Sequence, residues 1–286
     1  MRQVQMYSES FTGVYASCVG GVGNPAKLAD YNAAMPMMQG EAIIYERLAR
    51  QSAIYQIQGQ KTRLDDIVRG ALTRRDLTDL YEVQMVGLAK HARFHYDKIL
   101  LSPPHKKCPY CSLGQATTLD HYLPKSRFPQ FSVAVCNLVP CCKDCQSKKG
   151  KKYAATKSSQ TLHPYFDDPT YFQVNWVYGH VVRARAITVE FYVKPPSGWP
   201  MNMQQRVDAH FGSHRLAERY GIEAASELAS VREIYADLRA SGDFNQIRML
   251  LQRQAKGHIA NCPNSWQAAF YSALAADNWY CNSPVV

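Results

Sequence analysis

The segment between residues 108 and 150 decides the fold of this 286-residue chain. It reads CPYC at 108–111, LDHYLPKSRFP at 119–129, CNLVP at 136–140 and CCKDCQSKKG at 141–150. Each of its two Cys-x-x-C pairs forms a tight knuckle, and two knuckles can direct four thiolates at one ion in the tetrahedral geometry that zinc prefers. We therefore predict a structural zinc site with the ligands Cys108, Cys111, Cys142 and Cys145.

Cys141 is an alternative ligand because it adjoins Cys142. Only Cys142, however, has the two-residue spacing to Cys145 that a knuckle requires. Two redox Cys-x-x-C motifs or an iron–sulfur site are the competing interpretations. A zinc ion with four cysteine ligands is coordinatively closed, so it would stabilise a small element rather than activate water.

Between the two cysteine pairs lie an Asp-His dipeptide, Asp120-His121, and Asn137. The pattern predicts a strand over 117–122, a proline-containing loop and a second short strand over 133–139. A helix is predicted to start after Cys142, the third ligand cysteine. Together these elements make a ββα unit. On a regular strand Asp120 and His121 would point to opposite sides. At a frayed strand end, both could approach one phosphate.

LDHYLPKS followed by CNLVPCCKDCQSKKG resembles the HNH endonuclease superfamily, the ββα-metal nucleases with flanking zinc knuckles. The resemblance implies that Asp120 binds a catalytic Mg²⁺ or Mn²⁺ ion and that His121 is the general base for the attacking water. It implies that Asn137 orients the loop that carries the base. It also implies that Lys149 contacts a phosphate or caps the helix.

The third motif position of that superfamily is normally His or Asn, but here it is Gln146. A glutamine carbonyl can bind Mg²⁺, although its longer side chain changes the geometry. His163, in the sequence LHPYFD, is the alternative ligand, because some similar HNH proteins carry a His-Pro motif after the module. Otherwise His163 is a turn residue packed against Tyr165.

The net charge of +10 is concentrated in the same segment. Between residues 105 and 157, ten Lys and Arg residues are opposed only by Asp120 and Asp144, so this segment carries +8, or ten minus two. Basic side chains gain affinity for phosphates by releasing condensed counterions. The charge therefore favours a nucleic-acid partner over a lysine-rich surface that is merely solvated.

The flanking regions complete an α+β fold. Residues 1–104 are predicted to be mainly helical, with Ile44, Leu48 and Tyr55 on one apolar face. The resemblance implies that residues 105–168 form the HNH module. Residues 169–286 are predicted to contain a β-hairpin that turns near Gly179 and a C-terminal helical region with a helix starting near Asn264-Ser265.

No stretch of the chain approaches 18 uncharged apolar residues, and the N-terminus lacks the apolar core of a signal peptide. We therefore expect a cytoplasmic protein without a membrane partner. The flanks contain no recognisable DNA-reading module and resemble, less specifically, bacterial defence-associated HNH nucleases that work beside an ATPase partner.

The expected function is metal-dependent hydrolysis of phosphodiester bonds in nucleic acid, with DNA favoured over RNA. The expected setting is an anti-phage defence system, with a homo- or hetero-oligomeric assembly. The alternative is a non-catalytic, zinc-stapled subunit that binds nucleic acid or acts as a scaffold.

Overall fold

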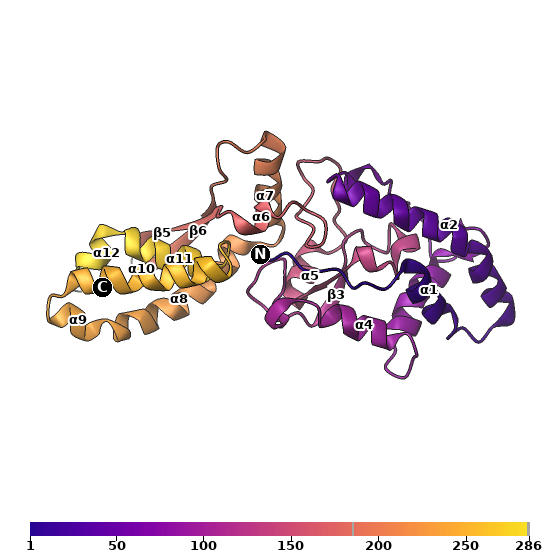
Figure 1. The fold of residues 1–286 in the computed structure, drawn as a ribbon, viewed down its shortest axis with the longest axis horizontal. Coiled ribbons are helices and arrows are strands. Elements are labelled where there is room, and N and C mark those ends of the chain that lie inside the picture. The colour runs from indigo at the N-terminus through magenta and orange to yellow at the C-terminus, as the bar shows by residue number, and fades with distance from the viewer. Residues whose placement is uncertain (185, 285–286) are drawn as a thin grey trace. The chain divides into compact units, whose positions relative to one another are not determined.

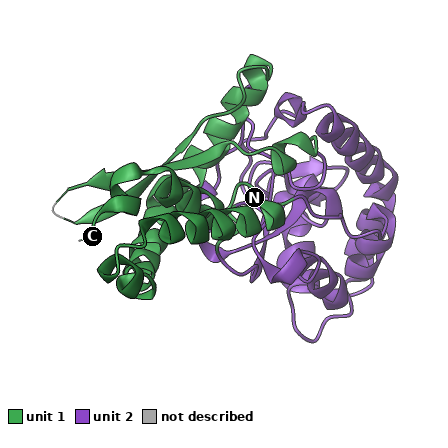
Figure 2. Cartoon of the chain, turned by 60° about the vertical axis from the view of Figure 1, so that its left-hand side comes forward, with its two compact units in different colours: residues 1–2, 111–113, 168–286 green, residues 3–110, 114–167 purple. Residues whose placement is uncertain are grey.

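The computed structural model describes residues 1–184 and 186–284. The chain divides into two compact units (Figure 2). Unit 1 consists of Met1–Arg2, Cys111–Leu113 and Asp168–Val286, and unit 2 consists of Gln3–Tyr110 and Gly114–Asp167. The described residues form helices and three two-stranded antiparallel sheets, so the fold class is α+β, as predicted.

Unit 2 begins with helices whose first turns are capped by the side chains before them. The Ser10 hydroxyl accepts from the Gly13 amide at α1, and the Asn24 side chain accepts from two amides at α2. Thr73 and Asp76 form a reciprocal capping box at α3. The elements of this part are α1 (Phe11–Val19), α2 (Pro25–Arg50), β1 (Ile67–Arg69), β2 (Leu72–Thr73), α3 (Arg74–Asp79), the π-helix η2 (Leu80–Met85) and α4 (Arg93–Leu100).

The buried face of α2 differs from the predicted one. Ile44 is 45% exposed, and Tyr55 lies beyond the end of the helix at Arg50, so the predicted apolar face is wrong. The buried face of the helix instead carries mostly alanine and tyrosine. Those residues are Tyr31, Ala34, Met38, Ala42, Tyr45 and Ala49.

A short hairpin followed by a helix closes unit 2. β3 (Thr118–His121) pairs antiparallel with β4 (Leu138–Cys141), and α5 (Lys143–Lys149) follows directly. Leu119 of β3 and Leu138 of β4 belong to the hydrophobic core that α1, α2, α3, η2 and α4 build. The hairpin is therefore fixed on one face by apolar packing, which positions the polar residues beside it.

Unit 1 is built around the antiparallel hairpin of β5 (Val177–Arg183) and β6 (Ile187–Val193). α8 packs on β6 and α11 on β5 (Figure 1). The Ser265 hydroxyl caps α11 by accepting from the Ala268 amide, which confirms the predicted start of this helix. The helices are α6 (Thr170–Gln173), α7 (Met201–Ser213), α8 (Leu216–Ile234), α9 (Ala236–Ala240), α10 (Phe244–Asn261), α11 (Trp266–Ala276) and α12 (Asn278–Asn282).

Gly179 lies inside β5 opposite Phe191, so the prediction of a turn at this glycine is wrong. A β-carbon on Gly179 would lie 2.9 Å from Val189 Cγ1 and 3.4 Å from the Ala269 carbonyl oxygen. The glycine thus allows α11 to approach the sheet closely. The strands are connected through residues 184–186, of which residue 185 lies outside the described residues.

Among the described residues, no helix is both long enough and apolar enough to span a lipid bilayer.

Candidate metal centre and neighbouring pocket

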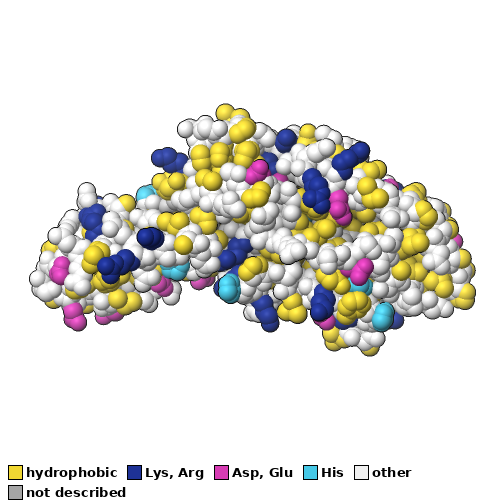
Figure 3. All heavy atoms as spheres, viewed as in Figure 1, with side chains coloured by type: hydrophobic (Ala, Val, Ile, Leu, Met, Phe, Trp, Pro, Cys, Tyr) yellow, Lys and Arg dark blue, Asp and Glu magenta, His cyan; other side chains and the backbone are white. Residues whose placement is uncertain are grey.

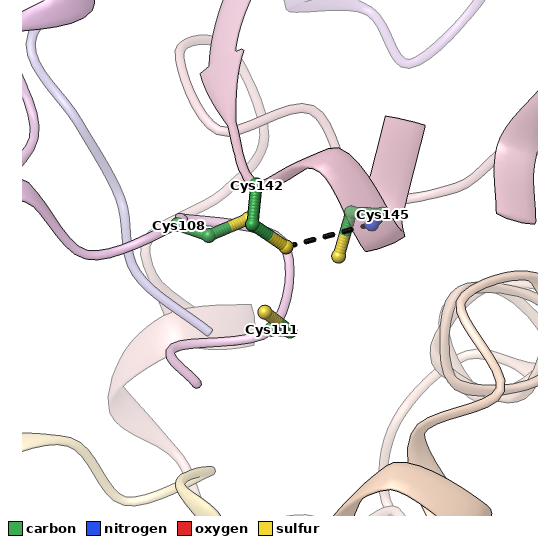
Figure 4. Close-up of side chains that lie close together, drawn as sticks. All are labelled: Cys108, Cys111, Cys142 and Cys145. Carbon is green, nitrogen blue, oxygen red and sulfur yellow. Dashed lines mark hydrogen bonds between the residues drawn. The ribbon is translucent and has the colours of Figure 1, made fainter. Parts of the chain in front are cut away.

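The four predicted zinc ligands come together in the structure. The sulfur atoms of Cys108, Cys111, Cys142 and Cys145 all lie within 4.8 Å of one another, and all four residues are buried (Figure 4). Zn–S bonds of about 2.3 Å in a tetrahedron place the sulfurs about 3.8 Å apart, so the observed cluster is consistent with a zinc site. Cys141 ends β4 and is not a member of this cluster of described residues.

Backbone hydrogen bonds shape the two knuckles. The Leu113 amide donates to Cys111 Sγ and the Cys145 amide donates to Cys142 Sγ, both at 3.4 Å. The second bond also makes Cys142 the N-cap of α5. Because each N–H group points at a sulfur, the knuckles stabilise the thiolate charge that metal binding requires.

Gly114 permits the two knuckles to meet. A β-carbon at this position would lie 2.8 Å from Cys142 Cβ and 3.1 Å from Cys142 Sγ. The Gly114 carbonyl also accepts from the Cys108 amide at 2.9 Å, which closes the loop of the first knuckle. Any larger residue would push the loop away from the third ligand.

A pocket of about 400 Å³ lies in unit 2 beside β3 and α5. His121 contributes the end of β3, Gln146 comes from the first turns of α5, and Lys125 comes from the intervening loop. The other lining residues are Tyr81, Glu82, Val86, Tyr96, Thr117, Thr118, Leu119 and Lys143. The structure therefore brings the predicted base and the residue at the third motif position into one pocket.

The His121 ring is held in a defined orientation and tautomer. Its Nε2 lies 2.8 Å from the Ser132 carbonyl oxygen, which can only accept, so Nε2 carries the proton. The Tyr81 ring packs edge-on against the imidazole at a centroid distance of 4.5 Å. Nδ1 is consequently the basic atom, and no hydrogen bond to it is formed among the described residues.

Burial is the main reason why His121 stays neutral. It lowers the pKa from the ordinary value of 6.5 to about 3, and the positive charges of Lys125 and Lys149 act in the same direction. The hydrogen bond to Ser132 opposes them. A lowered pKa keeps the imidazole neutral throughout the physiological range, and it also makes the ring a weaker base in the free protein.

We predict that His121 in the zinc-loaded protein remains about 99% neutral at pH 5, because a pKa of about 3 lies two pH units below. Ring ¹⁵N chemical shifts from NMR would show Nε2 protonated and Nδ1 unprotonated between pH 5 and 8. His121→Gln would assign the signals. A titration midpoint near 6.5, or a proton on Nδ1, would contradict this prediction.

Asp120 does not share the pocket with His121. β3 stays regularly paired through both residues, so the strand is not frayed and the two side chains point to opposite faces. The Asp120 carboxylate is buried, 3.0 Å from Lys149 Nζ and 3.2 Å from the Tyr110 hydroxyl that donates to it. Burial raises the pKa of Asp120, and Lys149 opposes that rise.

Lys149 also lies in a different environment from the one expected of a phosphate contact. It is only 5% exposed, and its ammonium group donates to the Asp120 carboxylate and to the His121 carbonyl oxygen at 2.7 Å. This lysine therefore ties the C-terminal end of α5 to β3. Its contact with Asp120 fixes the strand that carries His121.

Asn137 binds the loop between the two strands. Its Oδ1 accepts from the Leu123 amide at 2.7 Å and from the Tyr45 hydroxyl at 3.2 Å. Its Nδ2 donates to the carbonyl oxygens of Leu123 and Phe131 at 3.0 and 3.2 Å. The buried amide thus has four partners and holds both ends of the loop that supplies the Ser132 carbonyl.

We predict that Asn137→Ala lowers the free energy of unfolding by about 2–4 kcal/mol, because it leaves several buried loop groups without a partner. The loop around Ser132 should also loosen, which would slow any reaction that needs an oriented His121. Chemical denaturation measures the first effect. A change below about 0.5 kcal/mol would contradict the structural role of Asn137.

His163 is fully buried in an aromatic cluster, apart from the pocket lining. Its Nδ1 accepts from the Tyr165 amide at 3.3 Å, so Nε2 carries the proton and faces the Tyr45 hydroxyl at 3.3 Å. The Tyr122 ring lies 4.4 Å from the imidazole between centroids. His163 therefore contacts Tyr45, whose hydroxyl donates to Asn137, and it does not line the pocket that contains Gln146.

Glu82 is the pocket residue that the sequence does not reveal. It comes from η2, about 40 residues before His121, and its Oε1 lies 3.1 Å from Lys125 Nζ. No motif marks this glutamate. The only local signal is its neighbour Tyr81, a buried aromatic residue in an otherwise ordinary helical pattern.

The fold and site define a mixed α+β protein with a four-cysteine metal centre that is consistent with structural zinc. The chain is 34% identical to protein ea31 of Escherichia phage lambda over 221 residues. The matched segment covers 73% of this chain and 74% of ea31. The chain belongs to the family of protein ea31. No family model and no solved structure matches it at a significant level.

A shorter similarity links the chain to Septu protein PtuB of Bacillus thuringiensis. The two are 33% identical over 76 residues, which is 25% of this chain and 29% of PtuB.

Proposed function

We propose that this protein is a metal-dependent endonuclease of the HNH class that hydrolyses phosphodiester bonds, with DNA as the favoured substrate. One observation carries the proposal. His121 is a buried, neutral imidazole whose Nε2 is fixed by the Ser132 carbonyl while Nδ1 is the basic atom at a pocket containing Gln146 and Lys125. A neutral imidazole with a fixed tautomer has the protonation state that a general base for water needs.

The surrounding elements support this class. β3, β4 and α5 follow one another in the order of the ββα unit, and the four-cysteine centre lies at the start of α5. Asn137 holds the intervening loop through its amide. We take β3, β4 and α5 as the nuclease module, stabilised by a structural zinc ion that takes no part in the reaction.

The chemistry of the pocket follows from its charges. A phosphodiester placed between Lys125 and Lys143 would orient its phosphorus toward the water that His121 Nδ1 deprotonates. The phosphate charge would also offset the lowering of the His121 pKa by Lys125, which makes the imidazole a stronger base in the complex. A Mg²⁺ or Mn²⁺ ion, when bound, would stabilise the charge on the phosphate and on the leaving 3′-oxygen.

Exposed lysines supply the affinity for nucleic acid. Of the ten basic residues between 105 and 157, seven are exposed. They are Lys106, Lys107, Lys143, Lys148, Lys151, Lys152 and Lys157. On the face shown in Figure 3, basic side chains are scattered among other residues and form no single continuous patch.

The biological setting rests on the shorter similarity. Because 76 residues match Septu protein PtuB and the Asp120-His121 motif resembles that of defence-associated HNH nucleases, we propose that the chain is the nuclease component of an anti-phage defence system. The same resemblance leads us to propose an ATPase as its partner. The longer match is to a protein of a phage, so a phage genome also carries a member of this family. A pull-down with the product of the neighbouring gene would test the partnership.

The activity is tested by incubating zinc-loaded protein with duplex DNA, single-stranded DNA and structured RNA in Mg²⁺, Mn²⁺ or EDTA. We expect cleavage with Mg²⁺ or Mn²⁺, most rapidly on DNA, and none in EDTA. Because a single site cuts one strand, the first product on plasmid DNA should be the nicked circle.

A second candidate is the non-catalytic nucleic-acid binder. The observation that favours it is the position of Asp120, whose carboxylate is engaged by Lys149 instead of lying beside His121. If DNA binding is retained with no cleavage under any metal or partner, this second function holds.

A further inference from the structure

The pocket beside His121 contains one carboxylate among its described lining residues, and it is Glu82. We infer that Glu82, together with Gln146, holds the divalent ion of the proposed reaction. This inference rests on the proposed function, and it assigns the metal to a residue outside the sequence motif.

The position of Glu82 is set by its neighbour. Tyr81 packs its ring against the His121 imidazole and donates its hydroxyl to the Leu119 carbonyl of β3. Both contacts fix η2 against the strand, so Glu82, the next residue, lies at the rim of the same pocket. The π-helical form of η2 supports a functional role, because such insertions are frequent at functional sites.

Gln146 lines the same pocket and has an amide oxygen that could bind a metal ion. Its Nε2 donates to the Leu119 carbonyl oxygen at 3.1 Å, which leaves Oε1 as the atom available to a ligand. No hydrogen bond to Oε1 is formed within the described chain. Carboxylate and amide oxygens are the ligands that Mg²⁺ and Mn²⁺ prefer, with water completing the coordination.

The two candidate carboxylates differ in how readily they could release their lysine. Glu82 is paired with Lys125 at 3.1 Å, but its side chain is 54% exposed, so solvent weakens that pair and a divalent ion can displace the lysine. The Asp120–Lys149 pair is buried, with both side chains 6% exposed. Breaking it would leave an uncompensated charge inside the protein. The metal should therefore select Glu82 over Asp120.

Lys125 would then have two positions. In the free protein its ammonium group lies 4.9 Å above the Tyr81 ring and beside Glu82. When the ion takes Glu82, the ammonium group is released to a phosphate oxygen of the substrate. Metal binding and phosphate binding are thereby coupled through one lysine.

The experiment measures Mn²⁺ binding to zinc-loaded, full-length protein by electron paramagnetic resonance, with metal-dependent cleavage measured in parallel. Wild type should bind one Mn²⁺ ion. Glu82→Gln should weaken Mn²⁺ binding by at least about tenfold and require correspondingly more Mn²⁺ for cleavage. Lys125→Met should strengthen Mn²⁺ binding, because it removes the positive charge next to Glu82.

Asp79→Asn is the matched control, since Asp79 directly precedes η2 and does not line the pocket. It should bind Mn²⁺ as wild type does. If Glu82→Gln keeps wild-type Mn²⁺ affinity while Asp120→Asn loses it, the assignment to Glu82 is overturned and the nuclease function stands. If wild type neither binds Mn²⁺ nor cleaves with any divalent metal, both are overturned.

Discussion

His121→Ala should reduce the rate of metal-dependent DNA cleavage by a factor of about 10²–10⁴, the usual contribution of a general base. The loss arises because no other described histidine lines the pocket, so no other imidazole can take the proton of the attacking water. Zinc content and DNA affinity should stay at wild-type levels, because His121 is not a ligand of the cysteine centre and carries no charge at neutral pH. Single-turnover cleavage measures the effect.

His91→Ala is the matched control for this experiment. His91 is exposed and lies outside the pocket, so its removal should leave the cleavage rate within about twofold of wild type. A folded His121→Ala protein that cleaves at the wild-type rate would show that His121 is not the base. Equal losses in both variants would point to a general effect on the fold.

Cys145→Ser should remove the bound zinc and unfold the β3–β4–α5 region. Structural zinc in small domains contributes apparent binding free energies of about 10–16 kcal/mol, so losing one thiolate should cost several kcal/mol. The centre joins the start of α5 to the knuckle at residues 108–111, and α5 has only seven residues and is too short to be stable alone. Zinc analysis and hydrogen exchange over 105–157 measure the loss.

Cys141→Ser is the matched control for Cys145→Ser, because it changes a cysteine that lies beside the cluster and is not a predicted ligand. Cys141 is buried next to the cluster but is not a member of it, so this variant should keep one zinc ion per chain. Retention of zinc by Cys145→Ser together with its loss from Cys141→Ser would require a different ligand set.

The four-cysteine centre could be predicted because its geometry is local. A Cys-x-x-C knuckle is formed by four consecutive residues, and two knuckles need only meet once. Gly114, which lets Cys142 approach the first knuckle, carries no such signal by itself. A glycine in a loop is compatible with many conformations, and only the structure shows what lies against it.

The pocket is harder to predict from the sequence. It depends on which face of β3 each side chain points to, and on residues that are far away in the chain. The motif placed His121 and Gln146 together, but it did not show that β3 stays regular and turns Asp120 toward Lys149. Glu82 could not be predicted at all, since an exposed glutamate in a helical region is usually only solvated.

His163 shows why a short motif is a weak guide to a ligand. Its His-Pro sequence resembles a functional motif, but the aromatic residues around it bury the ring completely. Both ring nitrogens are engaged by Tyr165 and Tyr45. The prediction of a turn at Gly179 is wrong for a related reason. The glycine lets α11 lie close to β5, and the residues around Gly179 in the sequence carry no sign of that distant helix.

The most direct test of the proposed hydrolytic function is the chemistry of the cleaved ends. Zinc-loaded wild-type protein is incubated with DNA and Mg²⁺ in ¹⁸O-labelled water, and the ends are analysed by mass spectrometry. Attack by a water that His121 deprotonates, with departure of the 3′-oxygen, predicts 3′-hydroxyl ends and a single ¹⁸O atom in each new 5′-phosphate. Ends without ¹⁸O, 3′-phosphate ends, or cleavage that persists in EDTA would contradict the account.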